Sequence, residues 1–199
     1  MAPRKALFVI DIQKGIAVDS QTRVPHADRV IASAEGTLKA VRSVIDSYRE
    51  KDQPSPWVIY FIQHEETPER GPLLRGSEPW ELVFSPRVDV EEEVVVAKKT
   101  GNTFESNPTL SSRLRNAEIN EIVALGIQSE MCVDATCKGA LAAGFRVTLL
   151  SGAHSTYDSD GKSATEIERE VERRLSTRGA RVLRWEEAAS QWVREQRLA

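Results

Sequence analysis

The stretch Ala6-Leu7-Phe8-Val9-Ile10, followed directly by Asp11, Ile12 and Gln13, decides the fold class. Five consecutive apolar residues are typical of a strand that is buried on both faces, as strands of parallel sheets are. Similar apolar runs of strand length recur along the chain, at 57–62, 94–97, 119–126, 145–150 and 181–185.

Helical patterns separate these six strands. Apolar residues spaced three and four apart predict an amphipathic helix over Val30–Tyr48. The segment Met131–Ala143 suits a helix that is closed by Gly144. Further helices are expected from Asn107-Pro108 onward, over Ser163–Leu175 and over Glu186–Leu198. Strands that alternate with helices predict a single α/β domain over 1–199, with a parallel sheet covered by helices on both faces.

Composition excludes several classes of protein. The chain has 199 residues, with 27 Lys and Arg against 30 Asp and Glu, and such a slightly acidic balance argues against nucleic-acid binding. Its apolar runs are far shorter than the ~20 residues that a membrane span needs. Two cysteines, Cys132 and Cys137, cannot form a disulfide framework. With no signal-peptide pattern at the N-terminus, we expect a reducing, cytoplasmic location.

Reactive side chains follow the strands at their carboxyl ends, where parallel sheets bind ligands. Asp11 follows the first strand, Gln63 and His64 the second, and Lys98 the third, while Cys132 begins the helix after the fourth. Each residue alone has a simple structural explanation, but together they are the groups needed to activate a thiol as a nucleophile. A thiol is a strong nucleophile only as thiolate, which a helix N-terminus and a cation stabilise. A nearby carboxylate can accept the thiol proton and later donate it to a leaving amine.

Other chemistries fit the sequence less well. The first strand is followed by Asp11-Ile12-Gln13-Lys14-Gly15, which lacks the glycine pattern of a dinucleotide-binding loop, and no phosphate-binding loop is present. His26, His64 and His154 are scattered without the spacing of metal ligands. We therefore expect neither a cofactor nor a metal.

Four motifs in order carry a resemblance to a known family. The first is Asp11-Ile12-Gln13, and the second is Gly76-Ser77-Glu78-Pro79-Trp80-Glu81-Leu82 in the polar stretch 64–90, which we interpret as a long functional loop. The third comprises Lys98, Asn102, Phe104, Thr109 and Leu110, and the fourth comprises Gly126, Cys132, Val133, Thr136 and Gly144. With these motifs the sequence resembles the isochorismatase-like cysteine hydrolases, which include nicotinamidases, N-carbamoylsarcosine amidohydrolase and ureidoacrylate or biuret amidohydrolases.

This resemblance implies a Rossmann-like sheet with the strand order 3-2-1-4-5-6. It also implies a catalytic triad of Asp11, Lys98 and Cys132, and a cis peptide between Ile127 and Gln128. In relatives that peptide turns the backbone N–H at the Gln128 position toward the substrate. The N–H groups of Gln128 and Cys132 would then form an oxyanion hole.

Two departures from the relatives narrow the expected reaction. Nicotinamidases of the family bind a metal through an Asp-x-His pair after the second strand, where this chain has Gln63-His64-Glu65. Isochorismatases proper split a vinyl ether without a cysteine, so Cys132 favours the amidase branch, although Gln63 resembles what some isochorismatases carry. We expect a metal-independent cysteine amidohydrolase that cleaves a small carboxamide or ureido compound through a thioester. A vinyl ether hydrolase and a catalytically idle binding module of the same fold are the alternatives.

The substrate pocket is harder to predict than the triad. We expect its wall to contain Gln63, Trp80, Phe104 and Met131, while His64 is either a substrate contact or a loop residue without a task. The expected partner is a small molecule, with neither nucleic acid nor membrane. We further expect the chain to form a homo-oligomer, either a dimer or a tetramer.

Overall fold

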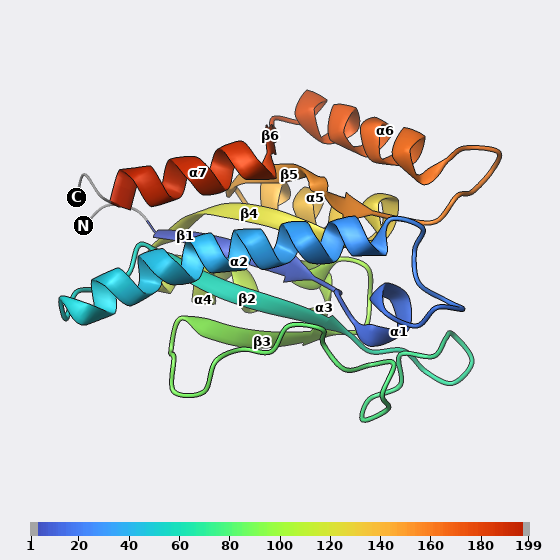
Figure 1. The fold of residues 1–199 in the computed structure, drawn as a ribbon, viewed down its shortest axis with the longest axis horizontal. Coiled ribbons are helices and arrows are strands. Elements are labelled where there is room, and N and C mark those ends of the chain that lie inside the picture. Colours follow the sequence, from blue (N-terminus) through green and yellow to red (C-terminus); the bar gives the residue numbers. More distant parts are fainter. Residues whose placement is uncertain (1–3, 197–199) are drawn as a thin grey trace.

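A computed structural model describes residues 4–196, which form one parallel sheet with helices on both faces (Figure 1). Its strand order is β3-β2-β1-β4-β5-β6. The strands are β1 (Arg4–Ile10), β2 (Trp57–His64), β3 (Glu93–Lys98), β4 (Ile119–Ile127), β5 (Arg146–Ser155) and β6 (Arg181–Arg184). The predicted fold class and strand order are confirmed. A single domain over 1–199 stays a prediction, because residues 1–3 and 197–199 lie outside the part of the chain that the structure describes.

Two layers of helices bury the two faces of the sheet. Along β1, Phe8 and Ile10 face one apolar cluster and Leu7 and Val9 the other, because successive side chains of a strand point to opposite faces. Helices α2 and α7 cover the second cluster, and α4, α5 and α6 cover the first. The helices are α1 (Lys14–Ala17), α2 (Ala27–Glu50), α3 (Thr103–Ser106), α4 (Leu110–Asn116), η1 (Ser129–Val133), α5 (Asp134–Ala142), α6 (Ala164–Thr177) and α7 (Trp185–Gln196).

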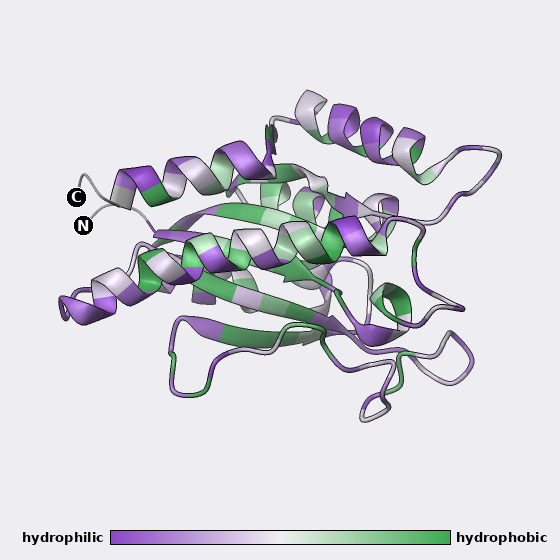
Figure 2. Ribbon diagram, viewed as in Figure 1, coloured by the Kyte–Doolittle hydropathy of each residue, from purple (hydrophilic) through white to green (hydrophobic). Residues whose placement is uncertain are grey.

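Hydropathy follows this arrangement closely. The strands are largely apolar, whereas the outer sides of α2, α6 and α7 are polar (Figure 2). Most charged residues of α6 form an outer face over a buried apolar stripe that includes Val171 and Leu175. Glu168 is the exception: it is buried and accepts hydrogen bonds from Arg29 and Ser155. No helix within residues 4–196 combines the length and the apolar character that crossing a bilayer would require.

Several elements differ from their predicted bounds. The helix expected from Met131 begins two residues earlier as the π-helix η1 and continues as α5. The short helices α1 and α3 carry too few apolar residues for a periodic signal, and α3 is capped by the Asn102 side chain, which accepts a hydrogen bond from the N–H of Phe104. The closing helix was expected to reach Leu198, which lies outside the described residues.

Strand β5 ends five residues later than predicted because it bulges and then pairs again with β4. Leu149 lies opposite Ala124, but the next paired residue, His154, lies opposite Gly126. At the bulge, Gly152 has φ +80°, in the left-handed region that glycine adopts readily. The bulge returns the end of β5 to the end of β4, next to η1.

Gly126 allows the ends of β1 and β4 to approach closely. Its φ is +137°, and a Cβ atom at this position would lie 2.0 Å from the carbonyl oxygen of Ile10. That carbonyl directly precedes Asp11. The glycine therefore fixes the place where the first reactive side chain leaves the sheet.

We predict that Gly126→Ala destabilises the fold much more than a matched glycine substitution. In Gly161→Ala the new Cβ meets no atom within 4 Å at φ +75°, so only the left-handed penalty of about 1–2 kcal/mol applies. Gly126→Ala adds a collision with backbone that cannot move aside. Urea unfolding of both variants measures the difference, and equal losses of unfolding free energy would contradict the role given to Gly126.

Candidate active site

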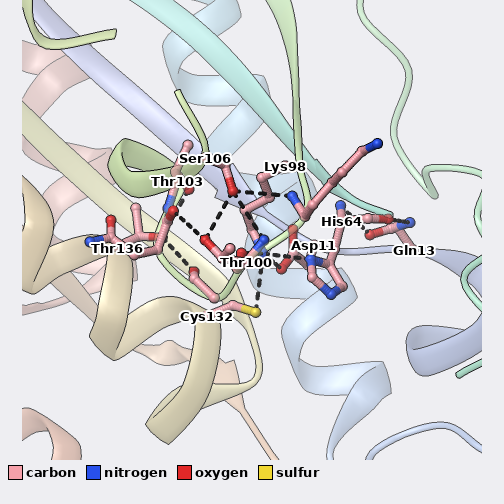
Figure 3. A network of polar contacts seen from close by, with 12 residues as sticks. Asp11, Gln13, His64, Lys98, Thr100, Thr103, Ser106, Cys132 and Thr136 are labelled. Atoms are coloured by element: carbon pink, nitrogen blue, oxygen red, sulfur yellow. Dashed lines mark hydrogen bonds and ion pairs between the residues drawn. The ribbon is translucent and has the colours of Figure 1, made fainter. Parts of the chain in front are cut away.

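Asp11, Lys98 and Cys132 meet at the carboxyl edge of the sheet (Figure 3). The Nζ atom of Lys98 lies 2.7 Å from Oδ2 of Asp11 and donates a hydrogen bond to Sγ of Cys132 at 3.1 Å. Asp11 and Lys98 are each 1% exposed, and Cys132 is partly buried. A carboxylate, an ammonium and a thiol thus lie together in a largely buried site.

Backbone geometry places each of these groups. Asp11 is the first residue after β1 and has φ +50°, so the chain turns as soon as it leaves the sheet. Lys98 is the last residue of β3 and pairs in register with His64 at the end of β2. Cys132 is the fourth residue of η1. It therefore lies in the first turn of the helix, where backbone N–H groups have no preceding turn to supply acceptors.

The ammonium of Lys98 also contacts two acceptors outside the triad. It also lies 3.1 Å from Nδ1 of His64 and donates to the carbonyl oxygen of Thr100 at 3.2 Å. Burial opposes the charge on Lys98, but Asp11 and Cys132 outweigh burial, so the pKa of Lys98 is raised. Lys98 therefore carries a permanent positive charge at neutral pH.

Cys132 rests as a thiol. Burial, followed by the charge of Asp11, raises its pKa to about 12, and the opposing effect of Lys98 is smaller. A pKa this high favours the thiol, which is the form that the expected role of Asp11 as acceptor of the thiol proton requires. The carboxylate of Asp11 thus disfavours a thiolate beside it.

His64 and Gln13 support the site from the side of β2. Burial, and then Lys98, lowers the pKa of His64, so the ring is neutral at pH 7 and can accept from Lys98 through Nδ1. Gln13 is fully buried; its Nε2 donates to the carbonyl oxygens of His64 and Trp80, and its Oε1 accepts from the N–H of His64. Gln13 thus joins the end of β2 to the long loop. In the sequence, Gln13 was indicated by the motif Asp11-Ile12-Gln13.

A cavity of about 440 Å³ opens over the triad, a size typical of small-molecule sites. Met131 lines it, as predicted, and so does His64. The other lining residues are Asp11, Ile16, Thr22, Glu66, Pro72, Leu73, Ile127, Gln128, Cys132 and Tyr157. Most of the wall comes from segments that carry no sequence motif.

Gln63, Trp80 and Phe104 were also expected in the wall, but none of them lines this cavity. Phe104 stacks on Phe8 and packs against Phe145 in the core. Gln63 is buried, and its Nε2 donates to the carbonyl oxygen of Trp80 at 3.0 Å. Gln63 thus joins β2 to the long loop, and Phe104 is part of the core.

The Ile127–Gln128 peptide is cis, at the position that the resemblance implied. Gln128 lines the cavity beside Cys132. Ser129, the next residue, is fully buried, and its Oγ lies 2.8 Å from Nδ1 of His154. The returning end of β5 thus packs against the start of η1, where the two expected oxyanion-hole amides lie.

A metal ion does not fit the triad in this arrangement. Donor atoms of Asp11, His64 and Cys132 all lie within 4.8 Å of one another, so the fold brings together ligand types that the sequence separates. However, Nζ of Lys98 lies 2.7 Å from the first and 3.1 Å from each of the other two. The ammonium occupies the centre that a cation would need, so these donors are already used.

Comparisons with known proteins agree with this fold. The family model of the isochorismatase domain matches residues 5–187. Two streptothricin hydrolase sequences from Streptomyces noursei are 32% and 31% identical over 78% and 88% of the chain. The chain spans only 56% and 58% of the length of these two relatives.

Solved structures show the same fold at lower identity. A cysteine hydrolase from Pseudomonas syringae superposes with a TM-score of 0.79 at 18% identity, covering 97% of this chain and 93% of that one. A pyrazinamidase from Pyrococcus horikoshii, in complex with zinc, superposes with a TM-score of 0.68 at 24% identity, covering 92% and 99%.

The unusual pKa of Cys132 gives a prediction for alkylation. Asp11→Asn removes the charge that raises this pKa and leaves the opposing ammonium of Lys98, so the pKa should fall and the thiolate fraction at pH 7 should rise. We predict that iodoacetamide labels Cys132 faster in Asp11→Asn than in the original protein, by up to about tenfold per unit of pKa. Peptide mass spectrometry measures the rate.

Cys137 serves as the internal control for this experiment. It is 1% exposed, and burial followed by Asp134 raises its pKa to about 12. Its labelling should not respond to the substitution at Asp11. An unchanged or slower reaction of Cys132 in Asp11→Asn would show that Asp11 does not hold the thiol protonated.

Proposed function

The chain belongs to the isochorismatase family of hydrolases, and from this membership we propose that it is a metal-independent cysteine amidohydrolase. Its substrate would be a small carboxamide or ureido compound, and the reaction would pass through a thioester. One observation carries the proposal: a single buried ammonium, Lys98, contacts both a carboxylate and a thiol under a cavity. In a vinyl ether hydrolase that thiol would have no task.

The first half of the reaction forms the thioester. Asp11 accepts the proton of Cys132 as Sγ attacks the substrate carbonyl carbon. Lys98 stabilises the negative charge while it moves from carboxylate to sulfur and carbonyl oxygen. The N–H groups of Gln128 and Cys132 are the proposed donors to that oxygen. Asp11 then donates its proton to the departing nitrogen, and the C–N bond breaks.

The second half releases the product. Water enters the position of the leaving group, and Asp11 accepts one of its protons as its oxygen attacks the thioester carbon. The C–S bond breaks, and the sulfur recovers its proton from Asp11. Atoms balance as one amide and one water giving one acid and one amine, and the site returns to a carboxylate, an ammonium and a thiol.

The relatives support an amidase without fixing its substrate. The streptothricin hydrolases, by their name, hydrolyse streptothricin, and they share about a third of their aligned residues with this chain. The vinyl ether alternative uses Asp11 as an acid and leaves Cys132 dispensable, so the two reactions differ in which variant is inactive. A cytoplasmic homo-oligomer, either a dimer or a tetramer, is part of the same proposal.

We predict that Cys132→Ala and Asp11→Asn both abolish amide hydrolysis. Loss of the base alone should cost at least the ~10²–10⁴-fold that is typical of general acid–base catalysis. Cys137→Ala, in which the second cysteine is removed from the apolar core, should keep its turnover per folded molecule. Ammonia release is measured across nicotinamide, ureido acids and biuret, together with acid quenching and mass spectrometry to detect an acyl group on Cys132.

These variants also separate the proposal from its alternatives. An inactive Asp11→Asn variant beside a fully active Cys132→Ala variant would establish the vinyl ether type of mechanism. Absence of hydrolysis of both compound classes by the original protein would favour the idle binding module.

The ammonium at the centre of the triad predicts that chelators have no effect. Extensive dialysis against EDTA should leave the rate of hydrolysis unchanged, because Lys98 already occupies the position between the three donor groups. The rate before and after dialysis, with and without added zinc or manganese, is the measurement. A rate that falls on dialysis and returns with metal would contradict the proposal.

A further inference from the structure

Glu66 gives the cavity a negative charge that the triad does not use. Two carboxylates line the cavity, and one of them, Asp11, is ion-paired with Lys98. Glu66 has no ion pair within 4.0 Å among residues 4–196, and no Lys or Arg lines the cavity in this part of the chain. The wall of the cavity therefore carries one carboxylate whose charge is not balanced locally.

The loop holds this carboxylate in place. The N–H of Glu66 donates to the carbonyl oxygen of Leu73 at 3.0 Å, and Oε2 of Glu66 accepts from the N–H of Leu73 at 2.9 Å. Gly71 lies directly against the carboxylate, since a Cβ at Gly71 would be 2.2 Å from Oε2 and 2.6 Å from Oε1. Glu66 is thus fixed before any ligand binds, and no described residue donates to Oε1.

The charge of Glu66 acts on the groups around it in the cavity. The pKa of Tyr157 is raised by burial and by Glu66, and Glu66 opposes the lowering of the His64 pKa. His64 remains neutral, and Tyr157 donates its hydroxyl proton to the carbonyl oxygen of Thr22. Arg70, on the same loop, is exposed and forms no ion pair with Glu66 within the described residues. None of these three side chains forms an ion pair with the Glu66 carboxylate.

We propose that the cavity selects small amides that carry a primary ammonium or guanidinium group remote from the reacting carbonyl, and that Glu66 binds this cation. The proposal rests on the amidase function above and names its substrate class. A fixed carboxylate with a free oxygen, in a partly buried wall without competing cations, favours a charge-assisted hydrogen bond. The apolar side chains of Ile16, Leu73 and Met131 suit the methylene chain between the two ends of such a substrate.

Three matched series of compounds test this proposal. They are straight-chain primary amides of three to six carbons whose far end is an ammonium, a methyl or a carboxylate group. Dissociation constants are measured by titration of the full chain carrying Cys132→Ala, so that no compound is consumed. Ammonia release by the original protein is measured separately.

We expect the ammonium series to bind at least about tenfold more tightly than the methyl series at the best chain length, and the carboxylate series to bind most weakly. Adding Glu66→Gln, which keeps an oxygen for the N–H of Leu73, should bring the three series to within about threefold of one another. Equal binding of the three series, no binding of any, or an ammonium preference that survives Glu66→Gln would overturn the proposal.

Two further variants remove the remaining ambiguities. Glu69→Gln changes an exposed carboxylate of the same loop and should keep the preference; losing it equally there would show a general field effect and overturn the assignment to Glu66. Gly71→Ala keeps every charge but displaces the Glu66 carboxylate, so it should weaken the preference even if Glu66→Gln folds poorly. Tight ammonium binding without hydrolysis would support the cation site while counting against the amidase function.

Discussion

The buried ammonium of Lys98 is the contact on which the rest of the site depends. A charge that is removed from water is costly unless it is paired, and Lys98 is paired with Asp11 while it contacts Cys132 and His64. Strands β3 and β1 are not neighbours, because β2 lies between them, so their backbones are separated by about 10 Å. The long lysine stem spans this distance over the end of β2. A shorter cation at the same place could not join β3 to β1.

Much of the fold was predictable, because each central strand is buried on both faces and appears as an uninterrupted apolar run. The triad was predictable for a related reason, since residues directly after such strands gather at one edge of the sheet. Successive side chains at the end of a strand point to opposite sides. Lys98 points into the site, whereas the side chain of Lys99 is 76% exposed.

The cavity wall was not predictable in the same way. Wall residues such as Glu66 and Leu73 come from a loop without periodicity, where hydrogen bonds between the two residues and the burial of Leu73 hold them in place. Phe104 was misassigned because its motif spacing indicates the family but not the face on which the ring packs. The bulge in β5 was also not predictable, because the apolar pattern ends at Leu150 whereas pairing with β4 resumes at His154.

The resting state of Cys132 has a consequence outside the catalytic cycle. Peroxides and disulfides react with thiolates far faster than with thiols, so susceptibility to oxidation follows thiolate character. A cysteine whose pKa is raised to about 12 is protonated almost completely at neutral pH. Burial, and after it the carboxylate of Asp11, therefore makes the sulfur less susceptible to oxidation while no substrate is bound.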